Sequence, residues 1–128
     1  MAAFSPAELG YLTNERLLGR LATVDATGLP HVVPTGWRYN ADLNTIDVTG
    51  RDLAATQKFR NVRNHPSAAL VVDDVLPPWR PRSVVIRGRA EAIGSPGDHH
   101  AVIRITPDRI TSWGLDANSA EPTKGTSR

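Results

Sequence analysis

The residues that could do chemistry gather between positions 51 and 65, where positive side chains are dense. Four cations fall within thirteen residues, at Arg51, Lys58, Arg60 and Arg63. Gly50 precedes them, and glycine lets the backbone approach a ligand closely. Cations combined with free backbone N–H groups at a strand–turn–helix junction can hold an anion such as a phosphate. The same residues also fit a solvated basic face on a small amphipathic helix, so the spacing leaves both interpretations open.

The element before these cations is a short strand. In residues 45–49, Ile46 and Val48 point to one side and Asp47 and Thr49 to the other. This alternation predicts a strand with one buried face. Gly50 should end it and direct the chain into the basic segment.

The basic segment itself is predicted to be a helix. Asp52 can act as its N-cap, and Ala55, Phe59 and Val62 are spaced four and three residues apart, which places them on one face. Pro66 should end the helix at the preceding residue or earlier.

The rest of the chain predicts mainly β-structure, after one short N-terminal helix that begins with the capping box Ser5-Pro6-Ala7-Glu8. The other expected strands cover residues 19–25, 30–39, 67–73, 83–93, 101–106 and 109–113. Residues 67–73 are nearly all apolar or small, so this strand is expected to be buried on both faces. Strands that follow one another as hairpins favour a mostly antiparallel barrel or sandwich over a doubly wound sheet.

Three features bend, divide or separate these strands. Gly88 suggests a bend of the kind that lets a sheet close into a barrel, and Pro107 with Asp108 is expected to separate the last two strands. A Pro-rich loop is predicted over residues 74–82. It carries Trp79, which would serve as a pocket lid, as an interface anchor, or only as local packing.

Pro34 and Gly36 lie inside the strand 30–39, where neither residue fits a regular ladder. One explanation is an edge strand or a bulge. The other is a backbone opened for something flat to lie against the sheet, and the sequence favours neither.

Composition excludes several classes of function. The chain has 128 residues, a formal charge of +2 and no cysteine, which fits one domain in a reducing cytoplasm without disulfide or thiolate chemistry. No apolar run reaches membrane-spanning length, and no signal peptide opens the chain. Neither a Walker loop nor a GxGxxG motif is present. The adjacent His99 and His100 do not have the spacing of a zinc helix, His31 stands alone, and no side chain stands out as an acid or base. The few aromatic residues are not interleaved with the cations, so nucleic-acid binding is not expected.

Five segments taken in order resemble a known family. They are GRLATVDATGLPHVVPTGWRY, TIDVTG, KFRNVRNHPSAALVVDD, VVIRGRAEAI and RITPDRITSWGL. Together they resemble the pyridoxamine 5′-phosphate oxidase-like split β-barrel proteins, and more narrowly the actinobacterial flavin/deazaflavin oxidoreductases. The match runs from about Pro6 to Asp116, so residues 1–116 are expected to form the cofactor-binding domain and residues 117–128 a disordered tail.

The resemblance implies a six- to seven-stranded antiparallel split barrel of the FMN-binding type, with short connecting helices, that forms a homodimer with cofactor grooves between its subunits. It implies that the cofactor ring lies along Val32, Val33, Pro34 and Thr35. It implies that Lys58 holds the phosphate, with Val48, Thr49, Gly50 and Asn61 as neighbours and Arg51 close by. The Trp79 loop would reach the cofactor from the partner subunit.

The function implied is hydride transfer between the deazaflavin coenzyme F420 and a small conjugated or quinone-like substrate. F420 is preferred because the resemblance is to the actinobacterial branch, and because Arg51, Arg60 and Arg63 could meet the anionic tail of that cofactor. An FMN-dependent flavoprotein and a non-catalytic flavin, F420 or haem binding protein are the alternatives. True pyridoxamine phosphate oxidases carry a C-terminal substrate-binding signature rich in Arg and His, which this chain lacks, so their substrate is not expected here.

Overall fold

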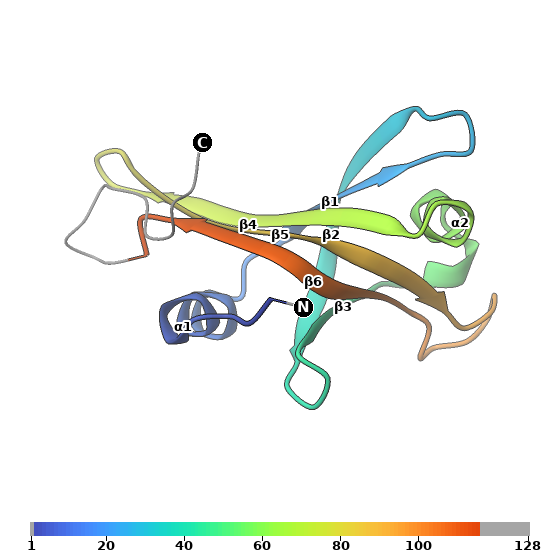
Figure 1. The fold of residues 1–128 in the computed structure, drawn as a ribbon, viewed down its shortest axis with the longest axis horizontal. Coiled ribbons are helices and arrows are strands. Elements are labelled where there is room, and N and C mark those ends of the chain that lie inside the picture. Colours follow the sequence, from blue (N-terminus) through green and yellow to red (C-terminus); the bar gives the residue numbers. More distant parts are fainter. Residues whose placement is uncertain (1, 116–128) are drawn as a thin grey trace.

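The computed structural model describes residues 2–115, which form a closed antiparallel barrel of six strands with two α-helices outside it (Figure 1). The elements are α1 (Pro6–Glu15), β1 (Gly19–Val24), β2 (Pro30–Asn40), β3 (Thr45–Thr49), the 3₁₀ turn η1 (Leu53–Ala55), α2 (Gln57–Asn64), β4 (Ser67–Leu76), β5 (Arg80–Ile93) and β6 (Val102–Trp113). Around the barrel the strand order is β1-β2-β3-β6-β5-β4. The predicted fold class is confirmed, while the tail expected at 117–128 lies outside the described residues.

β2 changes partner halfway along its length, and this change shapes the barrel. Residues 30–35 pair with β1, whereas residues 36–40 pair with β3. Within the described part of the chain, the first half of β2 therefore has only one strand neighbour. This half projects with β1 as a hairpin beside α2 (Figure 1). Pro34 is tolerated there because a strand open on one side can leave a missing N–H unpaired.

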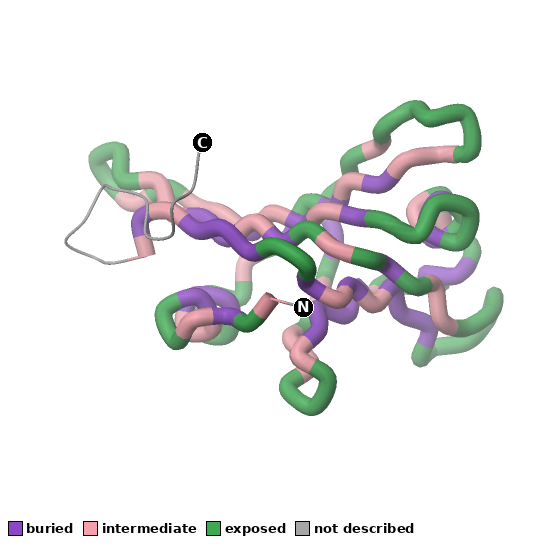
Figure 2. The backbone as a smooth tube through the Cα atoms, in the orientation of Figure 1, coloured by how far each residue is buried: buried purple, intermediate pink, exposed green. Residues whose placement is uncertain are grey.

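The core fills the barrel and extends beneath the helices. Figure 2 shows buried backbone along the strands and exposed backbone at the hairpin tips. Leu21, Leu70 and Ile86 are fully buried inside the barrel, and Phe59 and Val62 of α2 add to the same cluster. Burial of such apolar side chains is the main term that stabilises the fold.

α1 is fixed by its N-terminal cap and by contacts of Tyr11 near its middle. The predicted capping box is confirmed, because Glu8 N donates to Ser5 Oγ at 3.1 Å and Ser5 N donates to Glu8 Oε1 at 2.8 Å. Further along, Tyr11 donates its hydroxyl to Asp74 Oδ1 at 2.8 Å, and Arg82 stacks over the Tyr11 ring at 4.8 Å. α1 is therefore held against the β4–β5 hairpin as well as capped.

Among residues 2–115, no helix has the length and apolarity needed to cross a membrane.

The basic helix is shorter than predicted. Asp52 precedes only η1, with φ +48°, and its side chain makes no capping hydrogen bond. α2 starts at Gln57, and its N-cap is Thr56, whose hydroxyl accepts from Phe59 N. Ala55 belongs to η1 and is exposed, so it does not share the buried face of Phe59 and Val62. A second capping residue four positions downstream explains the error, because Thr is also a favoured N-cap.

Two predicted interruptions in the β-structure were wrong. The expected loop at 74–82 is a tight hairpin, because β4 runs to Leu76 and β5 starts at Arg80. The expected break at Pro107–Asp108 is absent, because β6 continues through it. Gly88 pairs with Pro107 while Arg87 pairs with Arg109, which leaves Asp108 as an extra residue. The bend at Gly88 is confirmed: a Cβ there would lie 1.9 Å from the Thr106 carbonyl oxygen.

Two expected burial patterns also differ. β4 alternates between buried and partly exposed residues, so it is not buried on both faces. β3 was expected to bury one face, but Asp47 is fully buried on the other. Arg104 donates to both carboxylate oxygens of Asp47 at 3.0 and 3.1 Å, and Asn40 and Thr45 donate at 3.0 Å. This buried carboxylate joins β3 to β2 and β6.

Candidate functional site

The junction of β2 and β3 brings together several of the residues implicated from the sequence. Gly36 pairs with Thr49, and the buried hydroxyl of Thr35 donates to the Thr49 carbonyl oxygen at 3.4 Å. The chain then turns at Gly50, where a Cβ would meet only Leu53 Cδ1 at 3.7 Å. Packing within the described chain therefore does not require glycine at position 50. Such a glycine leaves room for a ligand to approach the backbone.

Lys58 lies in the first turn of α2, eight residues after this glycine. Its side chain is partly buried, and burial lowers the pKa of the ammonium. No carboxylate of residues 2–115 pairs with it. A partly desolvated cation without a counter-charge is suited to an anionic ligand, because the ligand restores the interactions lost with water.

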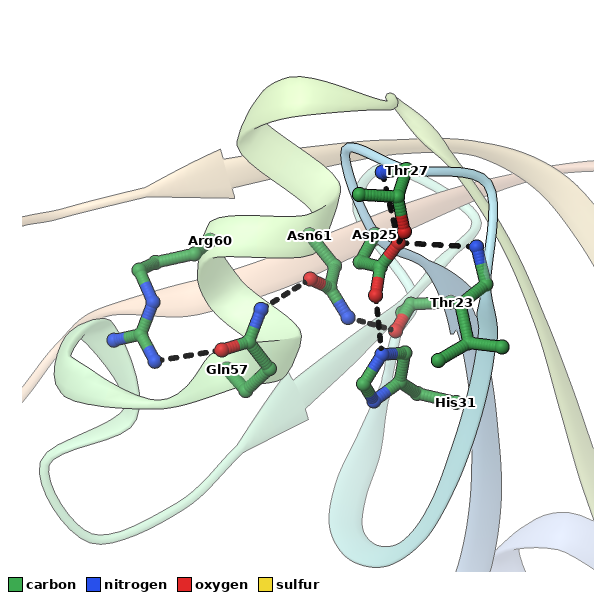
Figure 3. Close-up of polar contacts among 8 residues, drawn as sticks. Thr23, Asp25, Thr27, His31, Gln57, Arg60 and Asn61 are labelled. Carbon is green, nitrogen blue, oxygen red and sulfur yellow. Dashed lines mark hydrogen bonds and ion pairs between the residues drawn. The ribbon is translucent and has the colours of Figure 1, made fainter.

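Asn61 fixes the helix that carries Lys58. The Asn61 amide donates to Thr23 Oγ1 on β1 at 3.0 Å and accepts from Gln57 Nε2 at 2.6 Å (Figure 3). Lys58 and Asn61 are three residues apart, so they are neighbours on the helix surface. Asn61 is buried, and both ends of its amide are used within the protein. It positions α2 against β1 in this structure rather than presenting a free group to a ligand.

Thr23 was not predicted from the sequence, although it anchors α2. It lies 38 residues before Asn61, and nothing in the local pattern of β1 distinguishes it from an ordinary strand threonine. Only the closure of the barrel brings the two side chains together.

The tip of the β1–β2 hairpin has its own polar network (Figure 3). Asp25 Oδ1 accepts from Thr27 Oγ1 at 2.7 Å and from Leu29 N at 3.0 Å, and Asp25 Oδ2 lies 2.9 Å from His31 Nε2. These bonds, led by the one from Thr27, hold the pKa of Asp25 well below its usual range. His31 is thus engaged in holding the hairpin.

The residues expected along the cofactor ring lie on the half of β2 that has one strand neighbour. Val32 is 67% exposed and Val33 36% exposed, and Pro34 is exposed beside them. Side chains alternate between the two faces of a strand, so Val32 and Pro34 form an exposed apolar strip on one face and Val33 lies on the opposite face. Val48, by contrast, is fully buried in the core, so its side chain is not available to a ligand.

Arg51 lines a cavity of about 420 Å³ between the β3–η1 turn and the β5–β6 hairpin. The other two arginines expected near the cofactor are occupied on α2 itself. Arg60 donates to the Ala55 carbonyl oxygen and to Gln57 Oε1, and Arg63 stacks over the Phe59 ring at 5.1 Å.

Trp79 lies far from these residues within one chain. It sits in the turn between β4 and β5, which occupies the opposite end of the long axis from α2 (Figure 1), and its side chain is 75% exposed. One chain therefore does not bring Trp79 and Lys58 into the same site. Residues 2–115 also contain no cluster of His, Cys, Asp and Glu that could hold a metal ion.

Comparison with known proteins places this geometry in context. The sequence model of the family described as pyridoxamine 5′-phosphate oxidase matches residues 5–127. Over 123 residues the chain is 42% identical to a 5a,11a-dehydrotetracycline/5a,11a-dehydrooxytetracycline reductase of Streptomyces rimosus, and the alignment covers 90% of this chain and 86% of the relative.

Solved structures share the fold at low sequence identity. A conserved hypothetical protein from Mycobacterium tuberculosis has a TM-score of 0.71 and 21% identity, over 98% of this chain and 94% of the other. An FAD-binding protein from Mesorhizobium loti has a TM-score of 0.63 and 19% identity, over 85% and 92%. An F420 reductase has a TM-score of 0.56 and 21% identity, over 74% and 89%.

Proposed function

This chain belongs to the pyridoxamine 5′-phosphate oxidase family, and we propose that it is an oxidoreductase that transfers a hydride between a flavin-type cofactor and a small conjugated or quinone-like substrate. The cofactor proposed is F420, with FMN as the alternative. The relative at 42% identity is a reductase of a dehydro compound, and one structural neighbour is an F420 reductase. Both support a redox role for this chain.

One observation carries the proposal, namely the uncompensated Lys58 ammonium that follows the open turn at Gly50. Lys58 would hold the cofactor phosphate, and the N–H groups of the turn would lie close to it. Thr49 and Arg51 flank the turn, and the exposed strip of β2 would support the ring. The residues present fit a phosphate-bearing cofactor with a planar ring.

The cavity beside Arg51, which Asp52 and Asp98 also line, would receive the part of F420 that FMN lacks. Its volume of about 420 Å³ provides room beyond the phosphate turn, and FMN ends at its phosphate whereas F420 continues into an anionic tail. Arg51 would contact that extension. Arg60 and Arg63 would join it only by leaving their present partners on α2.

The protein's role in the reaction is to bind and orient. When bound in its reduced form, the cofactor supplies a hydride to one carbon of the acceptor, and a proton from water completes the two-electron reduction. The chain would keep α2 in place through Asn61 and Thr23 and would align the acceptor with the ring. No side chain is assigned an acid or base role.

We also propose a homodimer. Across the outer face of the barrel, apolar side chains of neighbouring strands stand side by side: Val32 pairs with Ala22, Ala22 with Ala69, and Val71 with Val85. Val32 is exposed and the other four are partly exposed, and a partly exposed apolar face of this kind would serve as a protein interface. In a dimer, Trp79 could reach the partner's cofactor groove. A monomeric mass by light scattering at high protein concentration would contradict this arrangement.

The functional proposal is tested by turnover. Reduced F420 is mixed anaerobically with the protein and a quinone or enone, and its oxidation is followed by absorbance; reduced FMN is tested in parallel. Acceptor-dependent oxidation that requires the protein is expected. Tight cofactor binding without oxidation by any acceptor would instead support a non-catalytic binding protein.

A further inference from the structure

A second cavity lies between the C-terminal end of α1, the segment that joins α1 to β1, and the second half of β2. Its volume is about 370 Å³, within the range of small-molecule pockets. The residues that line it include apolar and aromatic residues and two arginines, with Trp37 and Tyr39 on one face of β2 and Arg38 on the other: Leu17, Leu18, Trp37, Tyr39, Arg16 and Arg38. The cavity begins at Gly36, directly after the strip of β2 proposed for the cofactor ring.

Two hydrogen bonds hold the aromatic residues of the cavity wall in place. Trp37 donates its indole N–H to the Leu17 carbonyl oxygen at 2.9 Å, and Tyr39 donates its hydroxyl to Asn44 Oδ1 at 3.1 Å. Leu18 is 65% exposed beside them. A rigid aromatic surface next to an exposed leucine is suited to a flat, conjugated ligand.

The two cations at this cavity are poorly compensated. Arg16 caps α1 in a left-handed conformation, at φ 54°, and pairs with no carboxylate of residues 2–115. Arg38 is 62% exposed and lies 3.8 Å from Asp47. Asp47 is already held by both donors of Arg104 at shorter distances. Both guanidinium groups can therefore bind an acidic oxygen.

Gly36 is the third feature of this cavity that points to a ligand, after the aromatic wall and the two arginines. Its φ is not positive, and a Cβ there would meet only Thr49 Oγ1, at the ordinary contact distance of 3.5 Å. Nothing in the described chain requires glycine here, and glycine within a strand weakens it. Glycine at such a position is typical of a place where a ligand comes close to the backbone.

We propose that this cavity is the acceptor pocket of the oxidoreductase, and that Arg16 and Arg38 select planar conjugated acceptors that carry an acidic oxygen, as a carboxylate or an enolate. This inference rests on the proposed function for its redox role. Its binding chemistry can be tested separately, without any cofactor.

The test uses two acceptors that differ by one acidic group, 1,4-naphthoquinone and 2-hydroxy-1,4-naphthoquinone, of which the second is an anion at pH 7. Each is titrated into the cofactor-free protein, and quenching of tryptophan fluorescence reports the dissociation constant, since Trp37 lines the cavity. The anion should bind more tightly than the neutral quinone. Arg16→Gln and Arg38→Gln should each reduce this preference by about tenfold, and Arg38→Lys should restore part of it.

Two further variants test the role of Gly36 and provide a control outside the cavity. Gly36→Ala should weaken both ligands without lowering the melting temperature, because the added methyl occupies ligand space rather than the core. Arg109→Gln, at an exposed position on β6 outside the cavity, should leave the preference unchanged. Equal binding of the two ligands by the wild type, or a preference kept in the Arg16→Gln/Arg38→Gln double variant, would overturn the inference. Selective binding of the anion without turnover by F420 or FMN would uphold the pocket and overturn the proposed function.

Discussion

Replacing Lys58 with methionine should change cofactor affinity and the stability of the free protein in opposite directions. The ammonium is partly buried, and burial lowers its pKa. It pairs with no described carboxylate. In the free protein this buried charge lowers the free energy of unfolding. Methionine removes the charge and keeps a similar side-chain length and helix propensity. In the complex the same charge meets the cofactor phosphate.

The expected loss of affinity is that of one charge-assisted hydrogen bond. This is about 1–3 kcal/mol, or about 5- to 150-fold in the dissociation constant. The free variant should unfold at a higher urea concentration than the wild type. The pKa of Lys58 is lowered on folding, so the charge destabilises the wild type fully at pH values below the folded pKa. This destabilisation disappears as the pH rises above the unfolded value of about 10.4.

Fluorescence titration measures the dissociation constant, and urea unfolding of the cofactor-free protein at pH 7 measures stability. Arg109→Met is the control, since it removes one positive charge from an exposed strand position. It should change neither quantity beyond about 0.5 kcal/mol. If the Lys58 variant behaves like this control, Lys58 belongs to a solvated basic face and the anion site is refuted.

Three other substitutions test separate parts of the structure. Asp47→Asn should lower the free energy of unfolding by about 3 kcal/mol, since it removes the counter-charge of Arg104. Burial alone would raise the pKa of Asp47, but hydrogen bonds from Arg104, Asn40 and Thr45 lower it. In urea unfolding, the advantage of the wild type should therefore be complete above pH about 3.9 and be lost as the pH falls through the lowered folded pKa. Asn61→Ala should cost about 1–3 kcal/mol in unfolding, because Thr23 loses its buried partner, and it should also weaken cofactor binding in titration; unchanged binding would show that α2 needs no such anchor. Trp79→Ala should weaken cofactor binding at concentrations where the protein is dimeric, and an unchanged dissociation constant would remove Trp79 from the site.

Local patterns predicted most of the elements because the signals lie within a few residues of each other. The capping box at Ser5 and the bend at Gly88 depend on neighbours in the chain or on one special backbone position. Both are found where the sequence placed them. Consecutive hairpins, whose partners are close in sequence, predicted a mostly antiparallel barrel or sandwich, and the family resemblance implied the barrel.

Proline misled the prediction twice. Pro77 and Pro78 suggested a long loop, but the hairpin confines them to a three-residue turn between Leu76 and Arg80. Pro107 suggested a strand break, but it pairs opposite Gly88, at the irregularity where the ladder already gains a residue. A turn needs no ladder N–H from Pro77 and Pro78, and the irregularity opposite Gly88 tolerates the missing N–H of Pro107. A single stretch of sequence does not reveal that irregularity.

The polar anchors of the site were missed for a similar reason. Asp47 and Arg104 are separated by 57 residues, and Thr23 and Asn61 by 38. Each pair forms only when the barrel closes. An acidic residue on the outer face of a short strand is normally solvated, so the sequence contains no sign that Asp47 is buried.

The most direct measurement of the central claim is equilibrium binding of the cofactor. The purified protein, freed of ligand, is titrated with F420 and separately with FMN, and fluorescence follows the bound fraction. Saturable binding at micromolar concentrations, tighter for F420 than for FMN, is the predicted result. Selective binding of FMN would contradict the choice of F420, and binding of neither cofactor would contradict the proposed oxidoreductase itself.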